Sequence, residues 1–342
     1  MALASNSINF VAPNTVRNMR TDLGYLPALW ADDGDIILVN DVNTASNKAK
    51  KLKNYINHVT FVSHNDIKDI DQADKILPWG WDKALRFQLQ NDNVPTKLLP
   101  TDEYLDRIRN ISHRWWASQK LLKKLTEANM NRVGKALLIS DIKQLDDIDY
   151  KYVIKAPWSS SGRGVRYVNG LTKHQQGWAN NIIRHQGSLI LEPYYHKIMD
   201  FAVEFYAFPD CIKFLGLSVF QTSNGAYTGN IIANEKEKQE IISQYMAFDQ
   251  VQSAIDDICN ILNDEMVGKF TGPFGIDMMI VYENGIKLHP CVELNLRHTM
   301  GHIALAIQKN SSIPCKLMQI IYNEGFHFRI QETALNCRPS VW

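Results

Sequence analysis

Three oxygen-bearing side chains lie close together in the stretch GIDMMIVYENGIKLHPCVELNLRHTMGH, residues 275 to 302: Asp277, Glu293 and Asn295. Two carboxylates on one face of a packed sheet repel and desolvate each other unless a cation lies between them. Oxygen ligands of this kind suit a hard ion such as Mg²⁺, which keeps waters and substrate phosphates as its other ligands. The stretch therefore predicts a metal site, with a solvated strand face as the alternative, since polar alternation is common on strands.

The hairpin register decides whether these side chains share a face. A three-residue loop at 283–285, with glycine in a left-handed conformation, pairs Tyr282 with Ile286 and separates the apolar side chains from the polar ones. In that register we expect Asp277 to lie across from Cys291 and diagonally from Glu293. A two-residue turn would put the two carboxylates on opposite faces, so burial favours the longer loop.

A second candidate for chemistry is KAPWSSSGRGV, residues 155 to 165, where Lys155 ends an apolar strand and a serine-glycine loop follows. Backbone N–H groups and serine hydroxyls in such a loop can surround phosphate oxygens. The loop has neither the GxxxxGK[ST] pattern nor a dinucleotide fingerprint. An ordinary turn beside a solvated lysine remains the alternative for this stretch on its own.

The composition restricts the partners and the compartment. The 342 residues carry 37 Lys and Arg against 36 Asp and Glu, so no overall field attracts nucleic acid or an acidic membrane surface. No apolar run is long enough to predict a signal peptide or a membrane span. The five cysteines are scattered without a CxxC pair, which favours free thiols. We expect a cytoplasmic protein that binds neither nucleic acid nor membrane, and its oligomeric state is left open.

The elements around these stretches predict an α/β (α+β) fold. Up to residue 100, the runs at 35–40, 58–63 and 75–81 read as strands that alternate with helical segments, which indicates a parallel sheet. Two helices are expected next, the first capped by Thr101 and the second ending near Asn129. Longer strands and hairpins follow, which indicates antiparallel sheets.

The order of these motifs resembles the ATP-grasp superfamily, of the carboxylate-amine ligase type. The segment YVIKAPWSSSGRGV resembles its nucleotide lysine and phosphate-covering loop, and LILEPYYHKIMDFAVEF is similar to its interdomain strand and following acidic residue. The segment GIDMMIV followed by LHPCVELNLR resembles its paired metal strands, and ASQKLLKKL is similar to the helix with its other nucleotide lysine. The resemblance implies an N-terminal α/β domain at 1–100 and an ATP-grasp domain at 101–335, with a small lobe at about 130–192 and a large lobe at about 193–335.

The resemblance also implies a role for each matching residue. Lys120 and Lys155 would hold the α- and β-phosphates of ATP, and Arg297 would steady the transferred phosphoryl group, so that Arg297 and Lys155 are the expected catalytic residues. Glu192 would meet the adenine edge, and Asp200, where glutamate is more usual, would bind the ribose. Mg²⁺, as one or two ions and with Mn²⁺ as a possible substitute, would be held by Asp277, Glu293 and Asn295, and the loop residues expected on the phosphates are Ser159, Ser160, Ser161, Gly162 and Gly164.

The activity implied by the resemblance is ATP-dependent ligation, in which a small-molecule carboxylate becomes an acyl phosphate and an amine displaces the phosphate. The alternatives are a small-molecule kinase on the same fold and a nucleotide-binding protein without catalysis. No residue pattern identifies either substrate. His298 and His302 have the i, i+4 spacing of zinc ligands, but without HExxH a helix following the metal strand explains them better. His289 is a weak candidate for a general base, and the WGW and RWW segments are expected to pack in the core.

Overall fold

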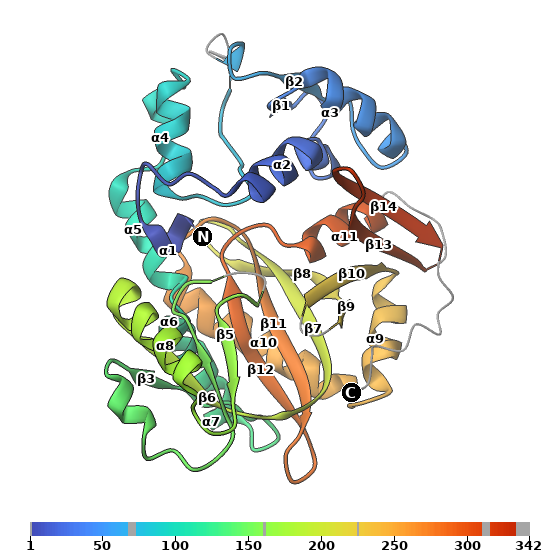
Figure 1. Ribbon diagram of the computed structural model, residues 1–342. Helices are drawn as coiled ribbons and strands as arrows, with labels where there is room; N and C mark the ends of the chain where they lie inside the picture. The colour runs from blue at the N-terminus through green and yellow to red at the C-terminus, as the bar shows by residue number, and fades with distance from the viewer. Residues whose placement is uncertain (1, 68–72, 160–161, 224–225, 310–314, 333–342) are drawn as a thin grey trace.

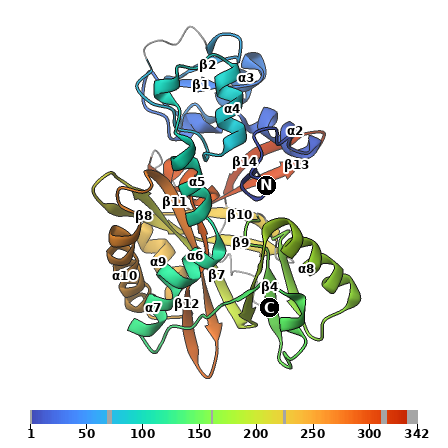
Figure 2. The same ribbon diagram turned by 90° about the vertical axis from the view of Figure 1, so that its left-hand side faces the viewer.

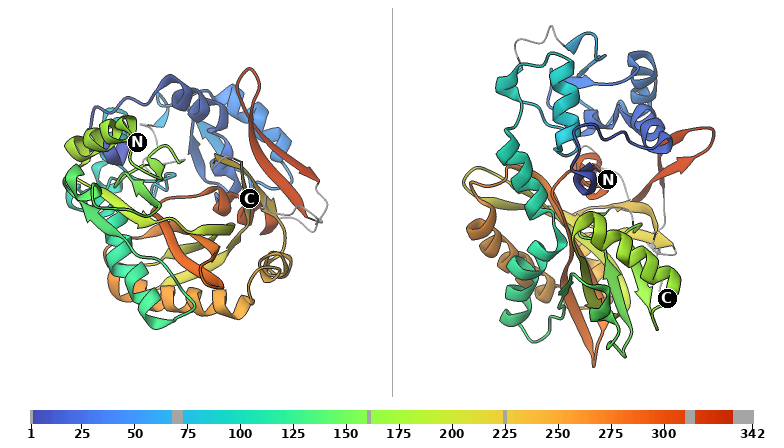
Figure 3. Two further views of the ribbon diagram at one scale, coloured as in Figure 1. Left: turned by 60° about the horizontal axis from the view of Figure 1, so that its bottom comes forward. Right: turned by 60° about the vertical axis from the view of Figure 1, so that its left-hand side comes forward.

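The computed structural model describes the chain except for residues 1, 68–72, 160–161, 224–225, 310–314 and 333–342. Its elements form an N-terminal region, a set of connecting helices and two lobes, and Figure 1 shows this arrangement. Figure 2, a view from the side, separates the N-terminal elements from a small lobe around β4 and α8 and a large lobe around β11 and β12. The right-hand view of Figure 3 shows the same division by colour. None of the helices in the described ranges is long and apolar enough to cross a membrane.

The N-terminal region contains a parallel pair of strands, as the sequence predicts. β1 (Ile36–Leu38) pairs with β2 (Thr60–Val62). The region also contains α1 (Ala2–Ser5), α2 (Asn14–Leu23), η1 (Leu26–Leu29), α3 (Val42–Ala49), η2 (Lys50–Leu52), α4 (Lys83–Asn91) and η4 (Thr96–Leu98). The third expected strand, at 75–81, is wrong: this segment pairs with neither strand and ends in a bend. Pro78 lacks the N–H that a strand ladder needs, and the carbonyl of the next residue, Trp79, accepts the His298 N–H instead.

Four consecutive helical segments connect this region to the lobes. They are α5 (Asp102–Ile111), α6 (Arg114–Ala117), the π-helical η5 (Ser118–Leu122) and α7 (Lys123–Ala128). Thr101 caps α5 as expected, because its hydroxyl accepts the Tyr104 N–H at 3.2 Å. His113 starts α6 in the same way, with its Nδ1 accepting the Trp115 N–H at 3.0 Å. The caps fix where each helix begins, and so the direction of the first side chains of α6.

The small lobe is one antiparallel sheet in the order β3-β6-β4-β5. Its strands are β3 (Leu137–Ile139), β4 (Tyr152–Lys155), β5 (Val165–Val168) and β6 (Leu189–Pro193), and its helices are η6 (Ile142–Leu145) and α8 (Lys173–Gln186). Buried side chains of the strands, Ile154 and Leu189 among them, pack against Ala179 on α8. The opposite face of the sheet is left for Lys155 and Glu192.

The large lobe contains two antiparallel sheets, β12-β11-β7-β8 and β14-β13-β10-β9. The first consists of β7 (His196–Ala207), β8 (Ile212–Ser218), β11 (Gly272–Tyr282) and β12 (Ile286–Asn295). The second consists of β9 (Phe220–Ser223), β10 (Ala226–Ile232), β13 (Lys316–Tyr322) and β14 (Phe326–Glu332), and the helices are α9 (Glu235–Ser243), α10 (Phe248–Met266) and α11 (Met300–Lys309). The fold class is therefore the expected one: a small parallel sheet followed by antiparallel sheets.

Two hydrophobic cores hold the large lobe in place. α10 packs on the face of the first sheet that carries Ile276 and Met278, so Asp277 between them faces the other way. A second core joins α11 and β13 to the N-terminal region, with Ile303 and Met318 packed in the same cluster as buried side chains of β1. The N-terminal region is thereby attached to the large lobe close to the end of β12.

The contact of α11 with β7 is so tight that we predict opposite effects for two glycine substitutions. A Cβ on Gly301 would lie 2.0 Å from Oε1 of the buried Glu204, whereas a Cβ on Gly177 in α8 would meet nothing within 4 Å. Gly301→Ala should lower the free energy of unfolding by about 1–3 kcal/mol or more through overpacking. Gly177→Ala should raise it by about 0.5–1 kcal/mol, since alanine favours a helix interior. Urea unfolding of both variants measures this, and equal stabilities would contradict the packing described.

Candidate functional site

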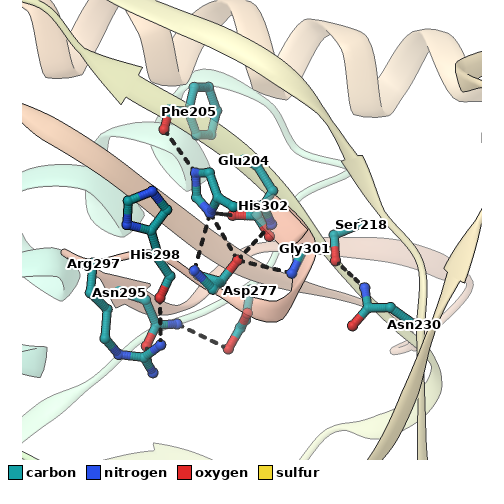
Figure 4. A network of polar contacts seen from close by, with 11 residues as sticks. Glu204, Phe205, Ser218, Asn230, Asp277, Asn295, Arg297, His298, Gly301 and His302 are labelled. Atoms are coloured by element: carbon teal, nitrogen blue, oxygen red, sulfur yellow. Dashed lines mark hydrogen bonds and ion pairs between the residues drawn. The ribbon is translucent and has the colours of Figure 1, made fainter. Parts of the chain in front are cut away.

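The β11–β12 hairpin brings the three predicted metal ligands together. The loop has the expected length: Tyr282 pairs with Ile286, and Asn284 and Gly285 have positive φ values of 53° and 119°. Asp277 lies directly opposite Glu293, and Figure 4 shows the Asn295 amide directed at the Asp277 carboxylate, with Nδ2 3.3 Å from Oδ2.

The expected position of Asp277 across from Cys291 is wrong, because a β-bulge changes the register. Met279 pairs with His289, but the next pair along is Asp277 with Glu293, so three residues of β12 lie opposite Met278 alone. Pro290 begins this bulge, and proline has no N–H to donate to the ladder. The bulge places the two carboxylates face to face instead of diagonally, which strengthens the repulsion between them.

Asp277 experiences this repulsion most strongly. Burial among protein atoms, followed by the charges of Glu293 and Glu204, raises the pKa of Asp277 from 3.8 to about 8, and Arg297 opposes the rise only in part. Its side chain keeps some contact with solvent. Without an added cation, this carboxyl group is largely protonated near neutral pH. A divalent ion would reverse that preference.

Arg297 lies next to this group at the end of β12. Its Nη2 donates to Asn295 Oδ1 at 2.9 Å, and its Nη1 donates to the His298 carbonyl at 3.1 Å (Figure 4). The Arg297 N–H donates to the Asn295 carbonyl at 2.9 Å. The predicted phosphoryl-steadying residue is therefore directly connected to a predicted metal ligand.

Lys155 and Glu192 form a buried pair on the small lobe. Lys155 Nζ lies 2.6 Å from Glu192 Oε2, and both side chains are less than 10% exposed. Nζ also reaches the Val292 carbonyl on β12 at 3.4 Å, so the pair joins the small-lobe sheet to the bulge of the β11–β12 hairpin. Breaking this pair by removing one partner would leave an uncompensated buried charge, so each side chain fixes the other in place.

Arg114 is a further site residue that the sequence reasoning missed. Its guanidinium is buried, with Nη2 2.7 Å from Glu293 Oε1, and Nη1 donates to the Ala156 carbonyl at 2.7 Å and to Ser159 Oγ at 2.9 Å. One side chain thus bridges the carboxylate hairpin and the start of the serine-glycine loop. The sequence does contain a signal for this residue, because Arg114 is a cation in the first turn of the predicted helix that also contains Lys120.

The structure does not bring Lys120 into this group. Lys120 Nζ lies 3.5 Å from Glu265 Oε2 on α10, and half of the Lys120 side chain is exposed. α10 covers the apolar face of the sheet, opposite to the face of Asp277. Arg114 lies in α6 and Lys120 in the π-helical η5, and this helical run turns Arg114 toward Glu293 on β12 and Lys120 toward Glu265 on α10.

The described part of the serine-glycine loop is closed at its base. The Ala156 N–H donates to the Gly164 carbonyl at 2.8 Å, and a Cβ on Gly164 would lie 2.2 Å from the Ser159 Cβ, which explains glycine at this position. Gly162 has a positive φ of 69°. The predicted phosphate contacts Ser160 and Ser161 lie outside the described residues.

Asp200, the predicted ribose ligand, lies on β7 opposite Met279 and forms an ion pair with Lys197. Both side chains line a small depression together with residues of β9, among them Phe220 and Gln221. Asp200 is thus on the strand next to the metal hairpin, two residues from Ala202, which pairs with Asp277.

A buried pair beyond Asp277 was also missed. Glu204 Oε2 lies 3.0 Å from His302 Nδ1, and His302 Nε2 lies 3.2 Å from the Phe205 carbonyl (Figure 4). Both ring nitrogens of His302 therefore have partners within the fold. In the described residues no three His, Cys, Asp or Glu side chains converge to hold a metal, so a zinc site at His298 and His302 finds no support there.

His289 is completely buried, with its ring 5.5 Å from that of Tyr195. Burial and the nearby Lys155 charge lower the pKa of His289 to about 3. The imidazole is neutral near pH 7, and such a weakly basic group is a poor proton acceptor.

The donor set at the hairpin fits Mg²⁺. It consists of two facing carboxylates, one with a raised pKa, and an amide oxygen, all on one rigid hairpin. Mg²⁺ is commonly bound through one or two carboxylates, with waters and phosphates completing the octahedron. In the described structure Arg114 supplies part of the positive charge that such an ion would add.

Comparisons with known proteins were made by sequence and by structure. No family model matches the chain, and no curated protein matches it. A solved structure of N5-carboxyaminoimidazole synthetase from Staphylococcus aureus with ADP matches 89% of this chain and 80% of its own, with a TM-score of 0.52 and 14% identity.

Two further structures cover a similar share of the chain. The biotin carboxylase domain of the Hydrogenobacter thermophilus 2-oxoglutarate carboxylase, with MgADP, ADP and bicarbonate, matches 90% of this chain and 72% of its own, with a TM-score of 0.53 and 13% identity. Biotin carboxylase from Campylobacter jejuni with a β-γ-ATP ligand matches 87% and 73%, with a TM-score of 0.51 and 13% identity. Identities this low establish the architecture alone. The chain has the ATP-grasp fold.

Proposed function

We propose that this protein is an ATP-dependent ligase that activates a substrate carboxylate as an acyl phosphate for attack by an amine. The observation that carries the proposal is the Arg114 bridge, which brings a buried guanidinium, Glu293 and the serine-glycine loop within hydrogen-bonding distance. A buried cation between an acidic hairpin and a loop of N–H groups is suited to a triphosphate with its metal. The three solved structures of this fold described above contain ADP, MgADP or an ATP derivative.

The nucleotide would lie between the two lobes. Lys155 and Arg114 would hold its phosphates, together with Ser159 and the loop that follows. Glu192 would accept from the adenine amino group, and Asp200 would accept from ribose hydroxyls. Lys120 was the residue expected on the α-phosphate, and the position of Arg114 favours Arg114 for that role.

Asp277, Glu293 and Asn295 would hold one or two Mg²⁺ ions, or Mn²⁺ in their place. The metal would neutralise charge on the transferred phosphoryl group. Arg297, which already donates to Asn295, would contact that group or the acyl phosphate. Glu293 would exchange the Arg114 guanidinium for the ion, which would leave Arg114 free to bind phosphate.

The proposed reaction has two steps. A carboxylate oxygen attacks the γ-phosphorus, the bond from phosphorus to the β–γ bridging oxygen breaks, and ADP leaves with the electron pair. An amine nitrogen then attacks the acyl carbon, inorganic phosphate leaves, and the nitrogen loses a proton. The serine-glycine loop would keep water from the acyl phosphate, and positioning of the two substrates can supply about 7–11 kcal/mol.

The first prediction from the proposed function concerns turnover. With a mixture of small carboxylic acids and amines, the purified protein should release ADP and phosphate, and release should require one member of each class. Glu293→Gln should reduce the rate at least 100-fold, because the hairpin loses a metal-binding carboxylate. ADP release with a stable phosphorylated acceptor would indicate a kinase instead, and Mg²⁺-dependent ATP binding without turnover would indicate a binding protein. Equal turnover by wild type and Glu293→Gln would contradict the metal assignment.

The second prediction separates Arg114 from Lys120. Arg114→Ala should weaken Mg·ATP binding by about 10- to 100-fold, since a charged hydrogen bond contributes about 1.5–3 kcal/mol. Lys120→Ala should change it less than about twofold, because an exposed ion pair with Glu265 contributes little. Calorimetric titration measures both, with thermal melting as a check on folding and Arg114→Lys as the variant that keeps the charge. A larger loss in Lys120→Ala would overturn this assignment.

The third prediction concerns the pH dependence of stability. The pKa of Asp277 is about 8 in the fold against 3.8 ordinarily, so between these pH values the native state keeps a proton that the unfolded chain has lost. In EDTA this group should make the free energy of unfolding fall as pH rises from about 4 to 8. Asp277→Asn should remove that part of the slope, and Mg²⁺ should raise the wild-type melting temperature more at pH 8 than at pH 6. Urea unfolding across this range measures the slope, and identical slopes for the two proteins would refute the proposed protonation.

A further inference from the structure

The turn at 78–81 of the N-terminal region lies directly against the backbone that carries Arg297. A Cβ on Gly80 would be 2.8 Å from the Arg297 Cβ, 3.7 Å from its Cα and 3.8 Å from the Leu296 carbonyl oxygen. The Trp79 carbonyl accepts the His298 N–H at 2.7 Å. Two consecutive residues of this turn therefore hold two consecutive residues at the end of β12.

Aromatic rings reinforce the contact on one side. Trp30, just after η1, stacks on the His298 ring with centroids 4.4 Å apart and planes at 25°. The Trp79 ring lies 6.0 Å from His298 and 5.9 Å from Trp30. Burial, with His302 nearby, lowers the pKa of His298 to about 3, so the stack contains a neutral ring. Two tryptophan rings of the N-terminal region thus pack against the His298 ring.

The turn itself is firmly attached. Trp81 packs against both the core around α10 and the core around α4. α4 is joined to α5 by the ion pairs of Lys83 with Asp106 and of Arg86 with Asp102. A movement of the turn therefore requires a movement of α4, and the turn can act as a stop for the Arg297 backbone.

We propose that Gly80 and Trp79 position Arg297 for the reaction, an inference that rests on the proposed function. With its Cβ in the position that Gly80 permits, Arg297 reaches Asn295 Oδ1 and the His298 carbonyl through its guanidinium. A side chain at position 80 displaces that Cβ, and a shift of about 1 Å at a reacting centre can cost about 100-fold. This assigns the 78–81 turn, far from the hairpin in sequence, to the reacting end of the site.

The test uses Gly80→Ala in the full-length protein and needs no knowledge of the substrates. The affinity for Mg·ADP is measured by calorimetry with and without aluminium fluoride, which mimics the phosphoryl group in transfer. In wild type, aluminium fluoride should tighten Mg·ADP binding at least tenfold. Gly80→Ala should lose at least fivefold of that gain, and Arg297→Ala should lose at least as much, while the affinity of Gly80→Ala for Mg·ADP alone stays within twofold. Gly177→Ala, with open space around its Cβ, should match wild type.

Two further variants keep the proposal testable if Gly80→Ala does not fold. Trp30→Leu removes the ring that stacks on His298 and should lose part of the aluminium fluoride gain, whereas Trp30→Phe should keep it. Full retention of the gain in Gly80→Ala or, if that variant is unfolded, in Trp30→Leu would overturn the proposal. Retention in Arg297→Ala would overturn it as well, by removing the role that the turn serves. A wild-type protein that does not bind Mg·ADP would refute the proposed function itself. If aluminium fluoride tightens Mg·ADP binding equally in wild type and in Gly80→Ala, only this inference is refuted.

Discussion

The repulsion between two carboxylates that face each other across one hairpin is the constraint on which the site depends. Asp277 and Glu293 are opposite residues of β11 and β12, and Glu204 adds a third negative charge from the neighbouring strand. Like charges this close cannot all be ionised in a partly buried place without compensation. Burial and the neighbouring carboxylates raise the pKa of Asp277, which favours its protonated form, and Arg114 forms a salt bridge with Glu293. Both are arrangements that a divalent ion and a triphosphate can replace.

The compensating cations come from three different parts of the chain. Arg114 starts a helix between the N-terminal region and the lobes, Lys155 ends a strand of the small lobe, and Arg297 follows the last strand of the β11–β12 hairpin. Arg114 and Lys155 contact residues of other elements, so the convergence of the three cations depends on how the lobes and the N-terminal region pack. The charge balance at the hairpin therefore depends on the packing of the whole molecule. The glycines at positions 80, 275 and 301 show how little free space that packing leaves, since a Cβ at each would meet a neighbouring atom within 2.8 Å.

Much of the local structure was predictable because its causes are local. Thr101 caps a helix by bonding to a backbone N–H three residues on, and Asn284 and Gly285 form the predicted hairpin loop with positive φ. The alternation of apolar and polar residues in β11 is sufficient to choose the loop length. The bulge at Pro290 was not predicted. The missing N–H of proline disrupts a strand ladder only where a partner strand would have accepted it, and that pairing is not visible in the sequence. The segment 75–81 has the composition of a strand, but the Trp79 carbonyl within it accepts the N–H of His298, which follows β12.

Local sequence patterns predicted the hairpin loop and singled out Asp277, Glu293, Asn295, Lys155 and Arg297 as candidates, since motif spacing and the two-residue period of strands depend only on neighbours in the chain. The tertiary structure decided which cation reaches the carboxylates. Arg114 and Lys120 belong to one helical run, and only the packing of that run between β12 and α10 turns the first toward Glu293 and the second toward Glu265. It also decided that a turn of the N-terminal region supports Arg297, because contacts between residues more than 200 positions apart exist only after the chain has folded.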